Sequence, residues 1–280
     1  MKVSRLVLTA ALAALVNGSS AFAHLTYGGR DFGTLVDGTA ATTIATQTLS
    51  SSFGWADATD SDWGDSHRGR FFRFTLTGTT SVSITAQRNT NAAATGATGV
   101  LLPGISLFSG LGTVAPEQPG HDGSDLSIAS RPGTTEGSFR ALSGWSLGND
   151  PTYNTAGDPL SGILYAARLA NFTCVGYAVD GASANFGSEP GIVGDGVADG
   201  YVNGYFADLP AGNYSVFVGG ANYDAQLTET ATHGSLSNAY DTYGVTVSVA
   251  AIPEPGTYAL GMGATALGAM LVRRRRRAQR

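Results

Sequence analysis

The chain of 280 residues is poor in charge and in cysteine. Charged residues make up 13% of it, about half the usual share for a soluble domain, while hydrophobic residues reach 42%. That apolar share is enough for a sizeable core and excludes wholesale disorder. The one cysteine, Cys174, excludes an intrachain disulfide and any cysteine-based zinc or iron–sulfur site. Because it lies in the apolar run Phe172–Val179, we expect a buried, inert thiol.

Basic residues are scarce in the middle of the chain. Between residues 24 and 252 there are no lysines and eight arginines, against 20 acidic residues, a formal charge of −12. This charge repels phosphate backbones, so we expect no nucleic-acid partner. The other basic residues lie at the two ends of the chain.

Residues 1–23 have the three parts of a secretory signal peptide. A positively charged start precedes 11 apolar residues, and small residues then occupy the −3 and −1 positions of a cleavage site. In chain order the parts are Lys2 and Arg5, Leu6–Val16, and Ala21 with Ala23. The sequence therefore predicts export of the mature chain from residue 24, with signal peptidase as a processing partner.

The C-terminal residues 253–280 also have three parts. Two prolines around a carboxylate exclude both a helix and a central strand at their position. An uncharged segment of 16 residues and a run of arginines follow. The parts are Pro253, Glu254 and Pro255, then 257–272, then Arg273, Arg274, Arg275, Arg276 and Arg277. As a helix the segment 257–272 is about 24 Å long, which crosses a bilayer only if its arginines snorkel.

Charge at both ends sets the orientation. Basic residues beside a membrane segment stay on the cytoplasmic side, which leaves residues 24–252 outside. The ordered parts of residues 253–280 resemble the PEP-CTERM sorting signal of Gram-negative bacteria, also catalogued as an ice-binding-protein C-terminal domain. The resemblance implies an exosortase, a membrane cysteine protease, as processing partner and a location at the cell surface or in the exopolysaccharide matrix. It implies no ice binding, because the body lacks long Thr-x-Thr ladders.

The body, residues 24–252, is predicted to be one all-β domain, an antiparallel β-sandwich of jelly-roll or Greek-key type with long loops. Alternating apolar residues predict strands over 72–76 and 82–86, joined as a hairpin, and over 214–218 and 245–249. Leu101–Phe108 and Phe172–Val179 are further candidates, and Ser161–Ala170 is ambiguous, with a short helix as one reading. Long Gly/Asp/Asn/Pro-rich stretches between these strands predict loops, the places where binding residues commonly lie.

Leu209, Gly212 and Tyr214 have the spacing of a tyrosine corner, in which the phenol packs inside and its hydroxyl bonds the backbone upstream. The segment Leu209–Gly220, followed by a valine-rich strand, resembles the bacterial pre-peptidase C-terminal type of β-sandwich. That resemblance implies an accessory module that is usually non-catalytic.

Two patterns suggest chemistry. Gly144–Gly148 matches G-x-S-x-G, the elbow of serine hydrolases, with Ser146 as nucleophile and only His233 well downstream as base. A turn in a Gly/Ser-rich loop explains it better, because no α/β alternation surrounds it. The second pattern is an acidic loop that either binds calcium or forms a solvated Asx turn. It contains Asp57, Asp60, Asp62 and Asp65, while Asp195 and Asp199 form a weaker pair.

The remaining candidates give no catalytic set. The histidines are scattered and include no H-x-x-x-H pair, so no zinc hydrolase is predicted. Trp55, Trp63 and Trp145 serve either to pack the core or to stack on sugars. The sequence predicts a non-enzymatic surface or matrix protein without a cofactor. A carbohydrate-binding module or adhesin, with exopolysaccharide as partner, and a secreted serine hydrolase are the alternatives.

Overall fold

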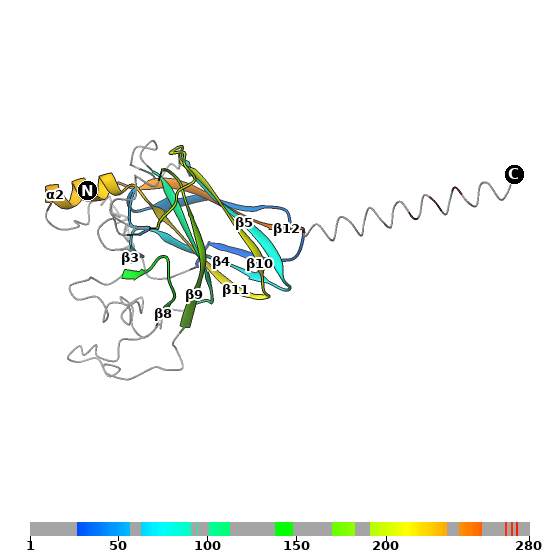
Figure 1. Cartoon of the computed structure of the whole chain (residues 1–280). Helices are drawn as coiled ribbons and strands as arrows, with labels where there is room; N and C mark the ends of the chain where they lie inside the picture. Colours follow the sequence, from blue (N-terminus) through cyan, green and yellow to red (C-terminus); the bar gives the residue numbers. More distant parts are fainter. Residues whose placement is uncertain are drawn as a thin grey trace, which may run out of the picture.

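In the part of the chain that the structure describes, the alternating sequence pattern forms strands, and there is little helix. The computed structural model describes residues 27–56, 63–90, 94, 101–112, 138–147, 170–182, 191–233, 241–253, 267, 270 and 273. In chain order the elements are β1 (Asp31–Leu35), β2 (Thr42–Leu49), β3 (Trp63–Asp65), β4 (Arg70–Leu76), β5 (Thr80–Asn89), β6 (Pro103–Ser109), β7 (Ser138–Arg140), β8 (Trp145–Leu147), β9 (Ala170–Val179), β10 (Tyr201–Leu209), β11 (Gly212–Gly220), α2 (Tyr223–His233) and β12 (Tyr243–Ile252). The predicted all-β class is confirmed (Figure 1).

Two sheets make up the body. One has six strands in the order β1-β4-β11-β6-β9-β8, and the other has four in the order β10-β5-β12-β2. Neighbouring strands are antiparallel except for β1 and β4, which are parallel. A small two-stranded sheet pairs β3 with β7. The predicted strands over 72–76, 82–86, 214–218 and 245–249 are all present, as are those near 101–108 and 172–179.

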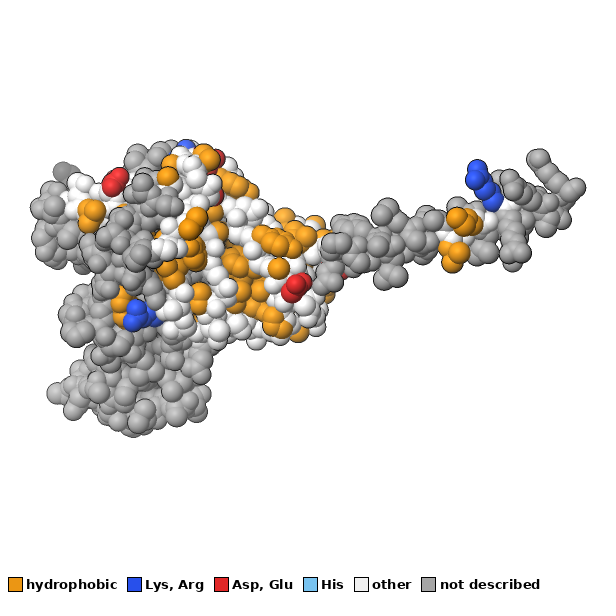
Figure 2. Space-filling model, in the orientation of Figure 1, with side chains coloured by type: hydrophobic (Ala, Val, Ile, Leu, Met, Phe, Trp, Pro, Cys, Tyr) orange, Lys and Arg blue, Asp and Glu red, His pale blue; other side chains and the backbone are white. Residues whose placement is uncertain are grey.

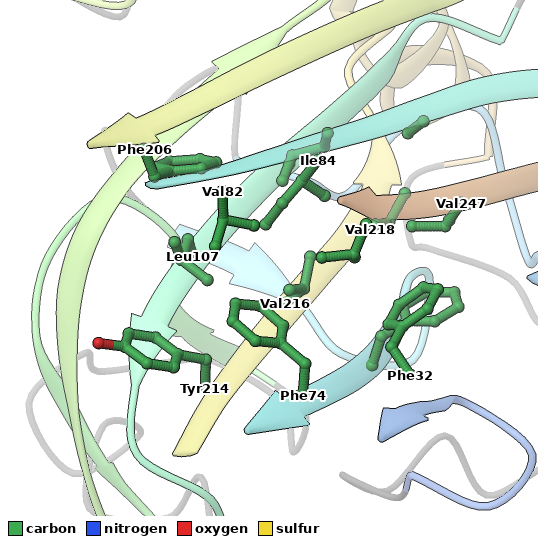
Figure 3. Packing of buried hydrophobic residues seen from close by; sticks show 14 of the residues in the cluster. Phe32, Phe74, Val82, Ile84, Leu107, Phe206, Tyr214, Val216, Val218 and Val247 are labelled. Carbon is green, nitrogen blue, oxygen red and sulfur yellow. The ribbon is translucent and has the colours of Figure 1, made fainter. Parts of the chain in front are cut away.

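The main core lies between the two sheets. Each contributes the apolar half of its alternating strands, and these side chains meet in one cluster (Figure 3). The six-stranded sheet supplies Phe72, Phe74, Leu107 and Val216, and the four-stranded sheet supplies Val82, Ile84, Phe206, Val247 and Val249. Burial of these side chains is the main favourable contribution to folding.

The predicted hairpin between residues 72–76 and 82–86 is wrong. β4 lies in the six-stranded sheet and β5 in the four-stranded sheet, so the connection around Gly78 crosses from one layer to the other. Both strands point their apolar residues into the same core, but from opposite sides. Alternation in the sequence shows which side chains are buried. The same alternation is expected for two strands paired in a hairpin and for two strands in opposite layers.

The tyrosine corner is confirmed. The Tyr214 hydroxyl donates a hydrogen bond of 2.7 Å to the carbonyl oxygen of Pro210, four residues upstream. Its ring lies parallel to that of Phe74, with centroids 5.1 Å apart, inside the main core (Figure 3). The corner thereby fixes the connection between β10 and β11, the point at which the chain passes from the four-stranded to the six-stranded sheet.

A second, aromatic cluster covers the outer side of the six-stranded sheet. Phe71 and Phe217 alternate with core residues and therefore point away from the main core. They meet Phe139 of β7, whose ring centroid is 5.6 Å and 4.4 Å from theirs. Trp55 and Tyr223 complete the cover. The middle of this sheet, at β6 and β11, is thus buried on both sides.

Candidate functional site

The G-x-S-x-G pattern does not form a nucleophile elbow. Ser146 lies in the middle of the short strand β8, where its Cα partner is Asn171 of β9. An elbow instead requires a sharp turn between a strand and a helix, with the serine at its tip. His233 is the last residue of α2. The strand geometry argues against a serine hydrolase at this position.

The acidic loop is described only at its last member, because Asp57, Asp60 and Asp62 lie outside the described residues. Asp65, at the end of β3, has both carboxylate oxygens in use. Oδ1 accepts a hydrogen bond of 2.8 Å from the His67 backbone N–H, and Oδ2 accepts one of 3.2 Å from Arg68 Nε. Burial raises the pKa of Asp65, but His67 and Arg68 outweigh it, and the pKa lies below its ordinary value. The Asp65 carboxylate therefore stabilises the turn that follows β3.

A second group of carboxylates ties β9 to β10. Asp180 follows β9 and is fully buried, and its two oxygens accept hydrogen bonds from the backbone N–H groups of Asp199 (3.1 Å) and Gly200 (2.6 Å). Asp195 accepts from the N–H groups of Gly181 and Val197, both at 3.1 Å. These carboxylates hold residues 195–200 against the end of β9, and their oxygens already serve backbone donors.

Burial raises the pKa of Asp180 to about 6. The charges of Asp195 and Asp199 raise it further, while the two backbone N–H bonds lower it. Among the described residues, histidine, cysteine, aspartate and glutamate form no group of three or more suited to a metal ion. The hydrogen bonds that Asp180 and Asp195 accept from backbone N–H groups give these two carboxylates a structural role in holding this connection.

Two of the three tryptophans are core residues. Trp55 is 0% exposed, and its Nε1 donates a 2.9 Å hydrogen bond to Ser106 Oγ. Trp63 is 3% exposed, with the Arg140 guanidinium 3.9 Å from its ring centroid. Neither ring can stack on a ligand in this structure. The Trp145 side chain lies outside the described residues. Cys174, expected to be buried, is partly exposed, because it lies on a strand near the sheet edge.

Among the residues that the structure describes, the exposed aromatic side chains are two tyrosines of β10, which sequence reasoning missed. Tyr201 and Tyr205 are 39% and 61% exposed. The strand alternates regularly, with exposed and buried residues in turn up to Phe206. Gly204 is one of the buried, inward-facing positions of the strand. A side chain does not fit there, because a Cβ would lie 2.7 Å from the Phe206 ring. This glycine weakened an alternation that would otherwise have revealed the strand.

The two tyrosines belong to the outer side of the four-stranded sheet, which we call the open face. Strand register arranges its residues in three rows across the sheet. These are Tyr201–Gln87–Thr246, Asn203–Thr85–Ser248–Thr43 and Tyr205–Ser83–Ala250. None of them is charged. On the side of the body that Figure 2 shows, few of the described side chains are blue or red.

Cross-strand hydrogen bonds hold the polar side chains of the open face in place. Ser83 Oγ donates to Asn203 Oδ1 at 2.7 Å, and the hydroxyls of Thr43 and Ser248 lie 2.8 Å apart. Such pairs stabilise neighbouring strands and keep the hydroxyls in one arrangement. The open face therefore presents ordered hydroxyl and amide groups, with two phenol rings along one edge.

The last strand meets the predicted sorting signal directly. β12 ends at Ile252 in the four-stranded sheet, and Pro253 follows it. Beyond Pro253 the structure describes Leu267, Met270 and Arg273, all helical in backbone geometry, with the two apolar side chains exposed. In the part of the chain that is described, no helix combines the length and hydropathy needed to cross a membrane. The rest of the tail and the signal peptide, with Ala21 and Ala23, lie outside that part.

No protein-family model and no curated protein matches the chain. Among solved structures it is similar to CorA, a surface-associated copper-binding protein important in copper acquisition by Methylomicrobium album BG8. The TM-score is 0.43 at 16% identity, over 79% of this chain and 98% of CorA. It is also similar to mercury-soaked MopE, a secreted protein of Methylococcus capsulatus in which an oxidized tryptophan facilitates copper binding. There the TM-score is 0.40 at 15% identity, over 80% of this chain and 87% of MopE.

Proposed function

We propose that the chain is an exported, non-enzymatic protein of the cell surface or exopolysaccharide matrix. The signal peptide delivers it, and the PEP-CTERM-like tail holds it at the inner membrane until an exosortase-like enzyme processes it. The observation that carries the proposal is the position of the tail. β12, the last strand that the structure describes, ends at Ile252, and the Pro-Glu-Pro element begins at the next residue.

The junction at Ile252 supports a sorting role because the body does not need the tail for its sheet. β12 has its full register with β5 and β2 before the first proline. Cleavage near Pro253 would release the domain intact. The exposed apolar side chains of Leu267 and Met270 find no burial in the body, as expected of a segment that serves a membrane.

Several observations favour a role other than catalysis. Ser146 lies in a strand, and the carboxylates of Asp65, Asp180 and Asp195 are engaged by backbone N–H groups. A fluorophosphonate probe tests the enzyme alternative directly. We expect no labelling of the full chain, and labelling that disappears in Ser146→Ala would contradict the proposal.

The sorting role is tested by fractionating cells that carry three forms of the protein. These are the full chain, a chain that stops after Pro253, and Glu254→Ala in the full chain. We expect the full chain at the surface or in the matrix with a new C-terminus near Pro253, determined by mass spectrometry. The truncated chain is exported without retention at the membrane, and Glu254→Ala is exported but unprocessed. Unchanged surface location of the truncated chain would overturn the role of the tail.

A further inference from the structure

We propose that the open face binds a neutral polysaccharide chain, with Tyr201 and Tyr205 as its stacking anchors. This inference goes beyond the proposed sorting role and does not depend on the tail. Its strongest support is the contrast within β10, which buries Val202 and Phe206 but exposes two phenol rings of the same strand.

Both rings lie on one side of the sheet, because residues four apart in a strand point the same way. A tyrosine presents a broad amphipathic ring at a low cost in side-chain entropy, since only two torsion angles must be fixed. The apolar C–H side of a sugar ring can stack on such a phenol, and the hydroxyl can bond to the sugar rim. Tyr205, at 61% exposed, is the more accessible of the two.

The distance between the two tyrosine rings favours a polymer over a single sugar as the ligand. Tyr205 lies four positions after Tyr201 in the strand, which places their Cα atoms about 13 Å apart. A ligand that contacts both anchors must be longer than one sugar ring. A single sugar can use only one anchor, so we expect binding to increase with chain length.

Polar groups between and beside the anchors match the remaining surface of a sugar chain. Ser83 and Asn203 are hydrogen-bonded to each other, as are Thr43 and Ser248. Because these pairs fix the side chains, the lone pairs that remain on their oxygens are held ready for ligand hydroxyls. The rows across the sheet thus continue the binding surface inward from the tyrosine edge.

Charge identifies the class of polysaccharide. None of the residues in the three rows of the open face is charged. The charged residues Asp199 and Asp208, just before β10 and near its end, are acidic and exposed, and the body as a whole is acidic. A polyanion would meet repulsion and find no arginine or lysine to pair with on this face. A protein partner usually buries an apolar centre, whereas the middle of this face consists of hydroxyls and amides. A neutral, hydroxyl-rich chain fits both observations.

Affinity electrophoresis of the full chain in nonionic detergent tests the proposal. Native gels contain dextran, galactomannan, hydroxyethyl cellulose or, as the anionic comparison, alginate. We expect retardation by at least one neutral polymer and none by alginate. The double variant Tyr201→Ala/Tyr205→Ala should weaken the dissociation constant at least tenfold, while Tyr201→Phe/Tyr205→Phe, which keeps both rings, should lose less than threefold.

The matched control is Val36→Ala/Leu227→Ala, which removes two exposed apolar side chains elsewhere on the body. It should bind as the wild-type chain does, and thermal melting should show every variant folded. The proposal fails if no neutral polymer retards the wild-type chain, if alginate retards it equally, or if the alanine pair binds normally. It also fails if sedimentation shows a dimer that the alanine pair abolishes, because the face would then contact a second copy.

Discussion

The two sheets of the body differ in what covers their outer sides. The middle of the six-stranded sheet is buried on both sides, and its strands β6 and β11 accordingly have nearly continuous runs of buried residues. The four-stranded sheet is buried on one side only, and β10 and β12 alternate between buried and partly or fully exposed residues. A strand thus shows in its sequence how many of its sides are covered. We therefore expect substitutions on the outer side of the six-stranded sheet to affect stability, whereas the outer side of the four-stranded sheet is accessible to a ligand.

Removal of an aromatic ring from the cover should produce the largest effect. Phe217 is fully buried, with the ring centroids of Phe71 and Phe139 4.9 Å and 4.4 Å away. Phe217→Ala should lower the free energy of unfolding by about 3–5 kcal/mol, because it leaves a cavity that its neighbours cannot fill. The control Thr85→Ala on the open face should stay within about 0.5 kcal/mol. Urea denaturation measures both, and equal losses would remove the contrast between the sheets.

A methyl group added beneath the cover should have the next largest effect. A Cβ at Gly104 would lie 2.4 Å from the Trp55 ring, whereas one at Gly78 meets nothing within 4 Å. Gly104→Ala should therefore cost about 1–3 kcal/mol through overpacking. Gly78→Ala should leave the unfolding midpoint unchanged or raise it slightly, because it restricts the unfolded chain. A tolerated Gly104→Ala would mean that Trp55 packs more loosely than the structure indicates.

The contrast between the sheets also explains which strands and which pairings could be predicted from the sequence. Alternation predicted β4, β5, β11 and β12 because each buries a regular set of Val, Ile, Leu or Phe. It could not assign β4 and β5 to different sheets, since both point into one core from opposite sides. Spacing alone predicted the tyrosine corner, because that motif is local and its hydrogen bond spans four residues.

Fewer residues of the candidate site could be predicted from the sequence. The sequence offered Trp55, Trp63 and Trp145 as aromatic anchors; the fold buries the first two, and the side chain of the third lies outside the described residues. Tyr201 and Tyr205 emerge only once β10 is paired with β5 and its outward side is known. The carboxylate of Asp180 likewise has no local signal, because its two donors lie about 20 residues further along the chain.

The connection between the two sheets at Asp180 should make stability depend on pH. The pKa of Asp180 is raised from 3.8 to about 6. Between these two pH values, Asp180 is largely protonated in the folded state and largely deprotonated in the unfolded state. The stability from this group is fully present below pH 3.8 and is lost as the pH rises through about 6. The stability difference between wild type and Asp180→Asn should therefore fall between pH 4 and pH 6.5.

Asp65→Asn is the matched control for this pH dependence. The pKa of Asp65 lies below its ordinary value, so its contribution is present above pH 3.8 and is lost only at more acidic pH. The stability difference between wild type and Asp65→Asn should thus stay constant from pH 4.5 to pH 6.5. Urea midpoints at four pH values separate the two carboxylates, and parallel curves for both variants would contradict the raised pKa of Asp180.

The smallest effect compares one chemical change in the two sheets. Tyr214→Phe removes the hydroxyl that donates to the Pro210 carbonyl, a hydrogen bond of 2.7 Å at the corner between β10 and β11. This should lower the free energy of unfolding by about 1 kcal/mol, the usual net value of such a bond. Tyr205→Phe removes an exposed hydroxyl and should change it by less than about 0.5 kcal/mol. Equal values would mean that the corner owes its position to ring packing alone, because the Tyr214 ring against Phe74 is unchanged in the variant.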